Sequence, residues 1–397
     1  MKGIILSLVT ACFAATAAHA THYPPATEHA VKRIVHDGQK LYILHYNGIE
    51  VRDKRTGATT CYRHGDGLFP SPTLNAIAVR NDTIWVGSGS GDLTAICGSW
   101  SQSWKITFNA GDDKTERPAW LGFNDLKFDS GGRLLFGGDN CVGMMQEPGK
   151  FPNVAVPGGL YFGTEIWRMA VDNDGRAWMT ASCASMTNCL MSYSPETGFT
   201  DGDIGDDANI YKMHTKALAI DADGNKWFGC TSKSPYAPAL CRYDGHGIEV
   251  HPFTSLSDRH DCPMDMAFDS HGRIWFINDI RWNKDDNGFT SYSKGPLCCF
   301  EDGKLTEYEY YEAGMGYSYC IDVDGETVYI GTDSGVLKFD GREFVMVDSE
   351  WEYTPTGIRQ AAGSSAGRPD IYDLQGRPVA DKPQKGMYIK DGKKYVN

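Results

Sequence analysis

A recurring strand–turn–strand phrase constrains the fold of this chain more than any other feature of its sequence. Each copy starts with an alternating apolar strand, passes through a tight turn of Asp, Asn, Ser and Gly, and continues into a strand with a large apolar or aromatic marker residue. The markers, spaced 43 to 54 residues apart, are Tyr42, Trp85, Leu135, Trp178, Trp227, Trp275 and Tyr329. Seven repeat units are therefore expected.

The length of the repeat predicts a β-propeller. The fifth copy contains four strand candidates, at residues 216–221, 225–230, 240–244 and 248–253. A period of about 40 to 50 residues with four strands is typical of one propeller blade. We therefore predict an all-β fold, a seven-bladed β-propeller of four-stranded blades over residues 31–350, with a short C-terminal β-hairpin tail.

The N-terminal residues 1–20 predict a secretory signal peptide. Lys2 precedes an apolar run that ends in Ala18-His19-Ala20, a small-x-small cleavage site. The alternative is a lipid anchor on Cys12, because residues 9–12 fit a lipid-attachment consensus. Residues 21–30 form a short N-terminal segment, and no later apolar stretch is long enough to span a bilayer. We expect a protein exported through the inner membrane, then secreted or at the cell surface, with a periplasmic location as the alternative.

The C-terminal residues 370–397 follow a linker at residues 351–369 that is rich in Gly, Ser, Ala and Pro. The tail carries the pattern Y-D-L-x-G-R-x-V … K-G-x-Y-I … G-K-K. This pattern resembles the sorting segments of type IX secretion substrates, which implies the export machinery as a partner. The alternative is a hairpin that caps the main domain.

Composition and motifs exclude several function classes. The net charge of −13 leaves no excess of basic side chains for nucleic acid. The Asp-x-Asp-Gly turns, such as Asp172 to Gly175, lack the further ligands of a calcium loop and suit tight hairpins instead. No C-x-x-C pair, Walker loop, dinucleotide fingerprint or G-x-S-x-G motif occurs. We expect no metal and no cofactor.

The repeat has the sequence motif D-x-x-G-x-x-W-x-G-T … G-x-x-x-Y/F-D, which resembles the two-component regulator propeller repeats of periplasmic sensors. It is also similar to the streptogramin lyase family, which shares the seven-bladed form. The resemblance implies a sensor-like binding module rather than a particular chemistry, because the motif builds blades.

Uneven loops indicate where a ligand would bind. The upper-rim loops at residues 182–188, 231–239 and 279–295 are long, whereas residues 332–335 form a short one. We therefore expect a site on the upper rim of blades four to six. Asn75 also enters from this rim, and the candidate ligand-binding residues are Asn124, Trp167, Arg168, His214, Lys216, His260, Asp261, Asp265, Arg281, Trp282, Tyr317 and Tyr319.

Aromatic faces mixed with polar side chains suit a glycan or another small polar organic ligand. A protein partner remains open, as does a purely structural role in which the aromatics pack neighbouring blades. The competing class is a lyase acting on an acidic glycan or cyclic ester, with His214 or His260 as general base. No local motif around either histidine supports that class.

The cysteines offer two local disulfide pairs in an exported protein. Removal of the signal leaves an odd number, eleven of the twelve. Cys183 and Cys189 bracket one loop, and Cys230 and Cys241 flank the hairpin of the fifth repeat.

Overall fold

In the computed structural model the chain forms two compact units, Met1–Glu352 and Tyr353–Asn397. The structure describes residues 30–109, 116–118, 121–139, 141–145, 147, 153–155, 165–182, 190–201, 209–211, 215–257, 260–280, 282–284, 290–292, 296–310, 317–349, 351, 371–372, 387–390 and 393–396. Among them, no helix has the length and apolar character that a membrane crossing requires.

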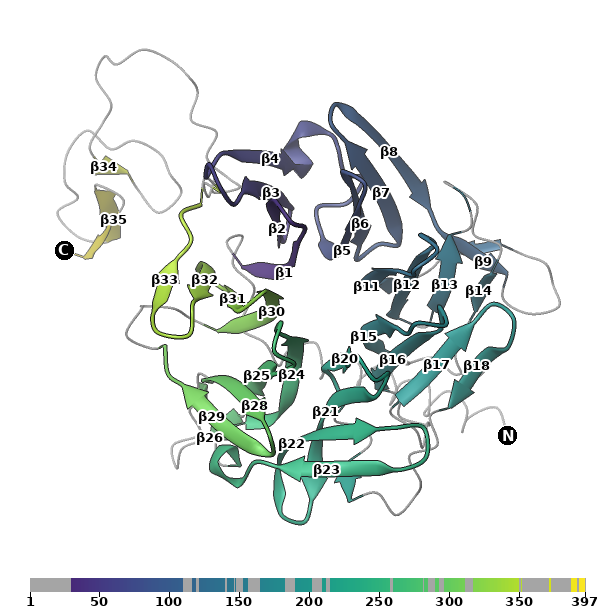
Figure 1. The fold of residues 1–397 in the computed structure, drawn as a ribbon. Coiled ribbons are helices and arrows are strands. Elements are labelled where there is room, and N and C mark those ends of the chain that lie inside the picture. The colour runs from purple at the N-terminus through teal and green to yellow at the C-terminus, as the bar shows by residue number, and fades with distance from the viewer. Residues whose placement is uncertain are drawn as a thin grey trace, which may run out of the picture. The chain divides into compact units, whose positions relative to one another are not determined.

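Six antiparallel sheets surround a central axis, and their first strands face it (Figure 1). The first two sheets are β1 (Val31–His36), β2 (Lys40–His45), β3 (Gly48–Asp53) and β4 (Thr59–Arg63), then β5 (Leu74–Arg80), β6 (Thr83–Ser88), β7 (Asp92–Cys97) and β8 (Trp100–Lys105). The third consists of β11 (Leu121–Phe128), β12 (Leu134–Asp139), β13 (Cys141–Met145), β14 (Asn153–Ala155), β15 (Glu165–Val171), β16 (Ala177–Ser182), β17 (Leu190–Ser194) and β18 (Gly198–Asp201).

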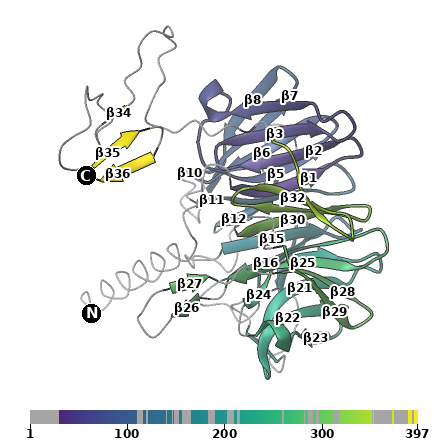
Figure 2. The ribbon, with the colours of Figure 1, turned by 90° about the vertical axis from the view of Figure 1, so that its left-hand side faces the viewer.

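The other three sheets complete the ring, which Figure 2 shows edge-on. The fourth is β19 (Ile210–Tyr211), β20 (Leu218–Ile220), β21 (Lys226–Lys233), β22 (Tyr236–Tyr243) and β23 (Ile248–Pro252). The fifth is β24 (His260–Phe268), β25 (Ile274–Ile280), β28 (Leu297–Glu301) and β29 (Lys304–Tyr308), and the sixth is β30 (Ser318–Asp324), β31 (Thr327–Thr332), β32 (Gly335–Phe339) and β33 (Phe344–Met346).

Among the described residues of the first unit, two small sheets and two short helices lie outside these six sheets. The small sheets are β9 (Thr107–Asn109) with β10 (Glu116–Pro118), and β26 (Trp282–Lys284) with β27 (Thr290–Tyr292). The 3-10 helices are η1 (His64–Asp66) and η2 (Thr254–Leu256).

The expected all-β propeller is confirmed, but the prediction of seven separate four-stranded blades is wrong. The described strands form six sheets around the axis, with four, four, eight, five, four and four strands. The third and fourth repeat units share the eight-stranded sheet because Asp139 of β12 pairs with Glu165 of β15. In the five-stranded sheet, β19 and β20 both pair with β21. The sequence period counts repeat units, and it does not report how those units join into sheets.

The second unit contains a three-stranded sheet, so the expected hairpin gains a strand. Its strands are β34 (Ile371–Tyr372), β35 (Met387–Lys390) and β36 (Lys393–Val396). The hairpin pairs β35 with β36, and β34 adds to the other side of β35.

In three repeat units a turn aspartate bonds both the turn backbone and the marker tryptophan of the hairpin. Asp172 accepts hydrogen bonds from the backbone N–H of Asp174 and Arg176, and its other oxygen accepts from the Trp178 indole at 2.7 Å. The same pattern joins Asp221 to Trp227 at 2.9 Å, and it recurs at Asp269 and Trp275. The spacing between aspartate and marker tryptophan therefore fixes the turn and seats the aromatic ring.

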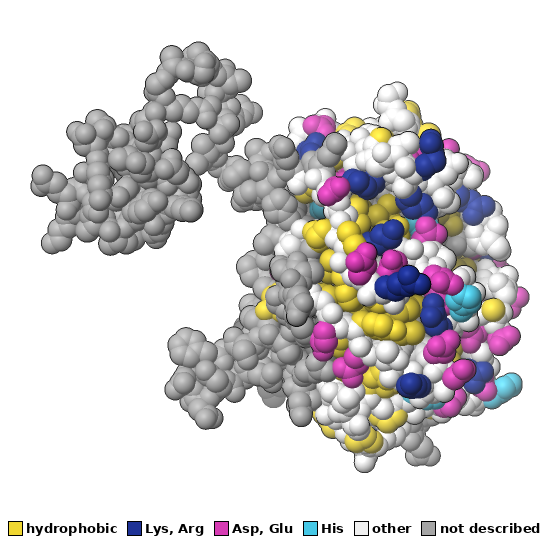
Figure 3. All heavy atoms as spheres, turned by 60° about the vertical axis from the view of Figure 1, so that its left-hand side comes forward, with side chains coloured by type: hydrophobic (Ala, Val, Ile, Leu, Met, Phe, Trp, Pro, Cys, Tyr) yellow, Lys and Arg dark blue, Asp and Glu magenta, His cyan; other side chains and the backbone are white. Residues whose placement is uncertain are grey.

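On the face shown in Figure 3, acidic and basic side chains lie interspersed around a band of hydrophobic side chains. Two of the ion pairs on the described surface are Lys40 with Asp82 at 3.2 Å and Lys105 with Asp92 at 3.3 Å. This face carries no extended surface of one sign, the feature on which binding to a phosphate backbone depends.

Candidate functional site

A bulge recurs at one position of the first strand in six repeat units. The pairing register shifts across one residue near the start of β1, β5, β15 and β30. β11 and β24 each have such a one-residue shift at the corresponding position and a second shift before it. A bulge re-aims the side chain that it carries. The half-buried residues at the six bulges, here called the mouth ring, are Lys32, Asn75, Asn124, Trp167, Met264 and Tyr319. The first strands surround a central channel along the axis of the propeller, and the mouth ring lies at its upper end, where these strands begin.

Polar contacts join members of the mouth ring to one another and to their neighbours. The Lys32 ammonium donates to the Asn75 carbonyl oxygen at 2.7 Å and lies 4.5 Å from the centre of the Tyr46 ring. Burial, followed by the charge of Arg33, lowers the pKa of Lys32 to about 8. On the opposite side of the mouth, the Lys216 ammonium lies 4.6 Å from the centre of the Trp167 ring.

Two acids lie beside Trp167 and Lys216. Asp139 accepts a hydrogen bond from the Asn124 amide at 3.0 Å and pairs with Glu165 across the strands. Burial raises the pKa of Asp139 to about 6, although the bond from Asn124 acts in the opposite direction. Burial, then the charge of Asp139, raises the pKa of Glu165 to about 7, and Lys216 opposes this rise. Both carboxyl groups therefore change charge close to neutral pH.

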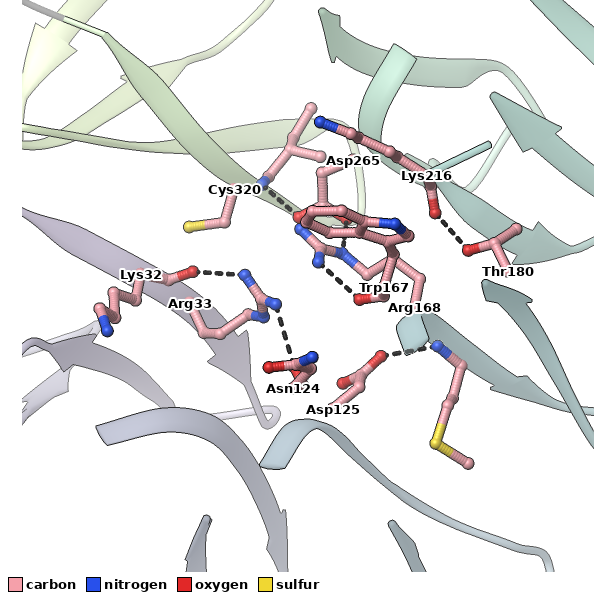
Figure 4. Close-up of polar contacts among 12 residues, drawn as sticks. Lys32, Arg33, Asn124, Asp125, Trp167, Arg168, Thr180, Lys216, Asp265 and Cys320 are labelled. Carbon is pink, nitrogen blue, oxygen red and sulfur yellow. Dashed lines mark hydrogen bonds and ion pairs between the residues drawn. The ribbon is translucent and has the colours of Figure 1, made fainter. Parts of the chain in front are cut away.

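Immediately after the bulges, four charged residues cross the channel (Figure 4). This central cluster consists of Arg33, Asp125, Arg168 and Asp265. Nε of Arg168 donates to Asp265 at 2.8 Å, and the Arg33 guanidinium donates to the Asn124 backbone carbonyl at 3.0 Å. Each contact joins repeat units that are two apart in the ring, the first with the third and the fourth with the sixth, so the cluster links strands that do not pair in a sheet.

The carboxylates of the central cluster also accept hydrogen bonds from the backbone of other strands. Asp125 accepts from the backbone N–H of Met169 at 2.8 Å, and Asp265 accepts from that of Ile321 at 3.1 Å. Burial alone would raise the pKa of Asp265, but the charge and hydrogen bond of Arg168, the charge of Arg33 and the Ile321 N–H together outweigh it and hold that pKa below its usual range. Asp265 is therefore ionised at neutral pH.

Below the central cluster the channel widens into a cavity of about 420 Å³. All four cluster residues line it, together with apolar side chains from the first strands: Ile34, Ile77, Met169, Leu218, Met266 and Ile321. Its size falls within the range of about 300 to 1,000 Å³ that small-molecule sites occupy. The central cluster separates this cavity from the mouth ring.

The structure brings half of the predicted ligand-binding residues together at the channel. They are Asn124, Trp167, Arg168, Lys216, Asp265 and Tyr319. Tyr317 precedes β30, where its carbonyl accepts from the Asp333 N–H at 3.0 Å. His214 and Arg281 lie outside the described residues, and so do the side chains of His260, Asp261 and Trp282, whose strands are β24 and β26. The lyase alternative therefore stays a prediction.

Sequence reasoning missed Arg33, Asp125, Asp139 and Glu165, and singled out Lys32 at no point. Arg33 and Asp125 had a usable signal, because each stands nine or ten residues before its marker, as Arg168 and Asp265 do. Aligning the repeats would have placed all four charges at one level of the channel. Asp139 is the last residue of β12, and Glu165 is the first residue of β15. No local sequence pattern indicates that these two residues pair.

The disulfide predicted between Cys230 and Cys241 is absent, since both are buried free thiols. Cys230 lies opposite Ala239 and Cys241 opposite Phe228, so the two cysteines are diagonal in the ladder rather than directly paired. Burial, then a hydrogen bond with Cys241, raises the pKa of Cys230, which disfavours the reactive thiolate. Cys183 and Cys189 lie outside the described residues.

Comparisons with known proteins bear on the fold. No protein-family model and no curated protein matches the chain. PorZ, a surface component of the type-IX secretion system of Porphyromonas gingivalis, is 11% identical with a TM-score of 0.55, over 80% of this chain and 48% of PorZ. The extracellular domain of the B. thetaiotaomicron system BT4673 is 18% identical with a TM-score of 0.45, over 80% and 46%. The designed protein Ika8 is 12% identical with a TM-score of 0.49, over 79% and 97%.

The chain thus spans less than half the length of the PorZ and BT4673 chains. At these identities, the likeness to PorZ supports the propeller fold, and activities of either protein do not transfer with it.

Proposed function

We propose that this chain is an exported ligand-binding β-propeller module that binds a glycan or another polar organic molecule at the upper mouth of its channel. One observation supports this most directly: Trp167 and Lys216 lie beside the near-neutral acids Asp139 and Glu165 at the start of the first strands. An aromatic ring covers the C–H patches of a sugar, and polar groups around it hold the hydroxyls.

The protonation of the two acids suits hydroxyl recognition. A carboxylic acid donates one hydrogen bond and accepts others, whereas a carboxylate only accepts. With pKa values of about 6 and 7, Asp139 and Glu165 offer both forms near neutral pH. A ligand hydroxyl, which both donates and accepts, is matched by such a pair.

A thermal-unfolding screen against glycans tests the proposal. A ligand that binds the folded state raises the melting temperature with concentration. Trp167→Ala should abolish the shift given by any hit, because it removes the aromatic face. Trp100→Ala is the matched control, since Trp100 lies on β8 with 49% of its surface exposed. The proposal fails if no glycan shifts the melting temperature, as expected for a protein-only scaffold, or if both variants respond alike.

Export is part of the same proposal, with residues 1–20 as the removable signal and residues 370–397 as a sorting tail. Intact mass spectrometry of the exported protein tests the N-terminal part. A chain that begins at Thr21 supports the signal, whereas an acylated Cys12 supports the lipid anchor. Deleting residues 370–397 should leave the protein inside the outer membrane if type IX machinery reads the tail.

A further inference from the structure

The central cluster holds two guanidinium groups, and one of them lacks an acidic partner. Arg33 donates to the backbone carbonyls of Lys32 at 2.8 Å and Asn124 at 3.0 Å. Its buried Nε has no hydrogen-bond acceptor among the described residues. Buried charges in proteins are normally paired with opposite charges. Arg33 therefore has one unused buried donor and makes no ion pair within 4 Å among the described residues, although the charges of Asp265 and Asp125 act on it from farther away.

The acids of the cluster are already engaged elsewhere. The two oxygens of Asp125 accept from the backbone N–H groups of Leu126 at 2.9 Å and Met169 at 2.8 Å. Those of Asp265 accept from Arg168 at 2.8 Å and from the Ile321 N–H at 3.1 Å. Arg168 uses Nε for Asp265 and one terminal nitrogen for the Trp167 carbonyl at 2.9 Å.

Arg33 and Arg168 both line the 420 Å³ cavity, and so do Asp125 and Asp265. Lys127 and Asp322 are the other charged residues of its wall, and the remaining lining residues are apolar. The mutual repulsion of the two guanidinium groups is felt at Arg33, whose pKa is lowered by burial and then by the charge of Arg168. An anion between them would receive charge-assisted hydrogen bonds from the guanidinium N–H groups. The apolar wall would favour a hydrophobic body attached to that anion.

We propose that the cavity below the central cluster binds an organic carboxylate, with the carboxylate between Arg33 and Arg168 and an apolar body against the first strands. Each terminal guanidinium nitrogen carries two N–H bonds, so the nitrogens that already donate to backbone carbonyls keep a second N–H for a carboxylate oxygen. This site is separate from the mouth ring, on the other side of the central cluster, and it does not depend on the function proposed there.

Three small probes separate charge from shape. Isothermal titration calorimetry at constant ionic strength should show saturable binding of benzoate. Benzyl alcohol has the same ring without the charge, and acetate has the charge without the ring, so each should bind at least about tenfold more weakly. Equal binding of benzyl alcohol would overturn the role of the arginines, and so would the absence of saturable benzoate binding.

Variants then locate the site. Arg33→Gln should weaken benzoate binding about tenfold or more, whereas Arg342→Gln, at an exposed arginine, should not change it. Arg33→Lys keeps the charge and loses the Nε donor, so its affinity should fall between those of the wild type and Arg33→Gln. Trp167→Ala, at the mouth ring, should leave benzoate binding intact. Unchanged affinity in both Arg33 variants would overturn the proposal, even if the glycan site proved correct.

Discussion

Glu165 is the residue whose protonation is most directly linked to the mouth of the channel. Its pKa of about 7 lies above the ordinary value of 4.5, because burial and the charge of Asp139 disfavour the carboxylate. At a pH between 4.5 and about 7, the Glu165 carboxyl group is protonated in the folded state and ionised in the unfolded state. The free energy of unfolding therefore falls as pH rises from about 4.5 through 7, and this loss is complete above pH 7.

Glu165→Gln should remove this dependence on pH. At pH 8 the variant should be more stable than the wild type by about 1 to 3 kcal/mol, and at pH 5 the difference should shrink. Urea unfolding at both values measures the effect. Glu301→Gln, at an exposed glutamate, is the control for the change in charge. Equal pH dependence in the wild type and Glu165→Gln would show that Glu165 is not buried as described.

Asp139 shares this titration, because the two carboxyl groups face each other across β12 and β15. Interacting acids lose their protons in two steps that belong to the pair. Asp139→Asn should consequently lower the pH at which the remaining glutamate ionises, which an NMR titration of Glu165 would detect.

At the scale of elements, close backbone packing positions the bulged strands. A side chain on Gly138 of β12 would collide with the carbonyl oxygen of Gly122 in β11, and one on Gly122 would lie 2.5 Å from the Gly89 Cα. These three glycines bring the strands of the second and third sheets together beside the channel mouth. Their lack of a Cβ atom, rather than backbone freedom, is what the site requires.

Gly138→Ala should destabilise the protein by about 1 to 3 kcal/mol, because the new methyl group meets backbone that cannot move aside. Gly38→Ala provides the control, since no atom lies within 4 Å of its added Cβ. Differential scanning calorimetry of both variants measures the contrast. Identical melting temperatures would contradict the close packing of Gly138 on Gly122.

The strands and turns were predictable from sequence because their causes are local. Alternating apolar residues indicate a strand, and Asp172 with Trp178 lies within one hairpin. The joining of β12 to β15 was not predictable, because it depends on one residue pair separated by 26 positions in the chain. At the site, Arg168 and Asp265 were expected at the rim, but their ion pair across the channel follows from closure of the ring, which no single repeat encodes.

At the scale of the whole propeller unit, no strand among the described residues is exchanged between the first and last sheets of the ring. The sixth sheet uses only strands from residues 318–346, and the first only strands from residues 31–63. Side-chain contacts therefore hold the closure. Trp351 stacks on His45 with 4.3 Å between ring centres, and Arg52 donates to the Asp348 carbonyl at 2.6 Å.

His36 makes this closure sensitive to pH. Its Nδ1 lies 2.7 Å from an Asp322 oxygen, and its Nε2 lies 3.6 Å from Asp324, so β1 and β30 are joined across the seam. The hydrogen bond with Asp322 raises the pKa of His36, burial acts against it, and the charges of both aspartates add to the rise. Because the pKa is raised on folding, the stabilisation is complete below about 6.5 and is lost as pH rises through the folded-state value.

His36→Gln should therefore destabilise the propeller mainly in acid. We expect a loss of about 1.5 to 3 kcal/mol at pH 5.5, the usual contribution of a hydrogen bond to a charged group, and a smaller loss at pH 9. Urea unfolding at both pH values measures it, with His246→Gln at an exposed histidine as control. A larger loss at pH 9 than at pH 5.5 would mean that neutral His36 holds the seam by packing, and that closure does not depend on its charge.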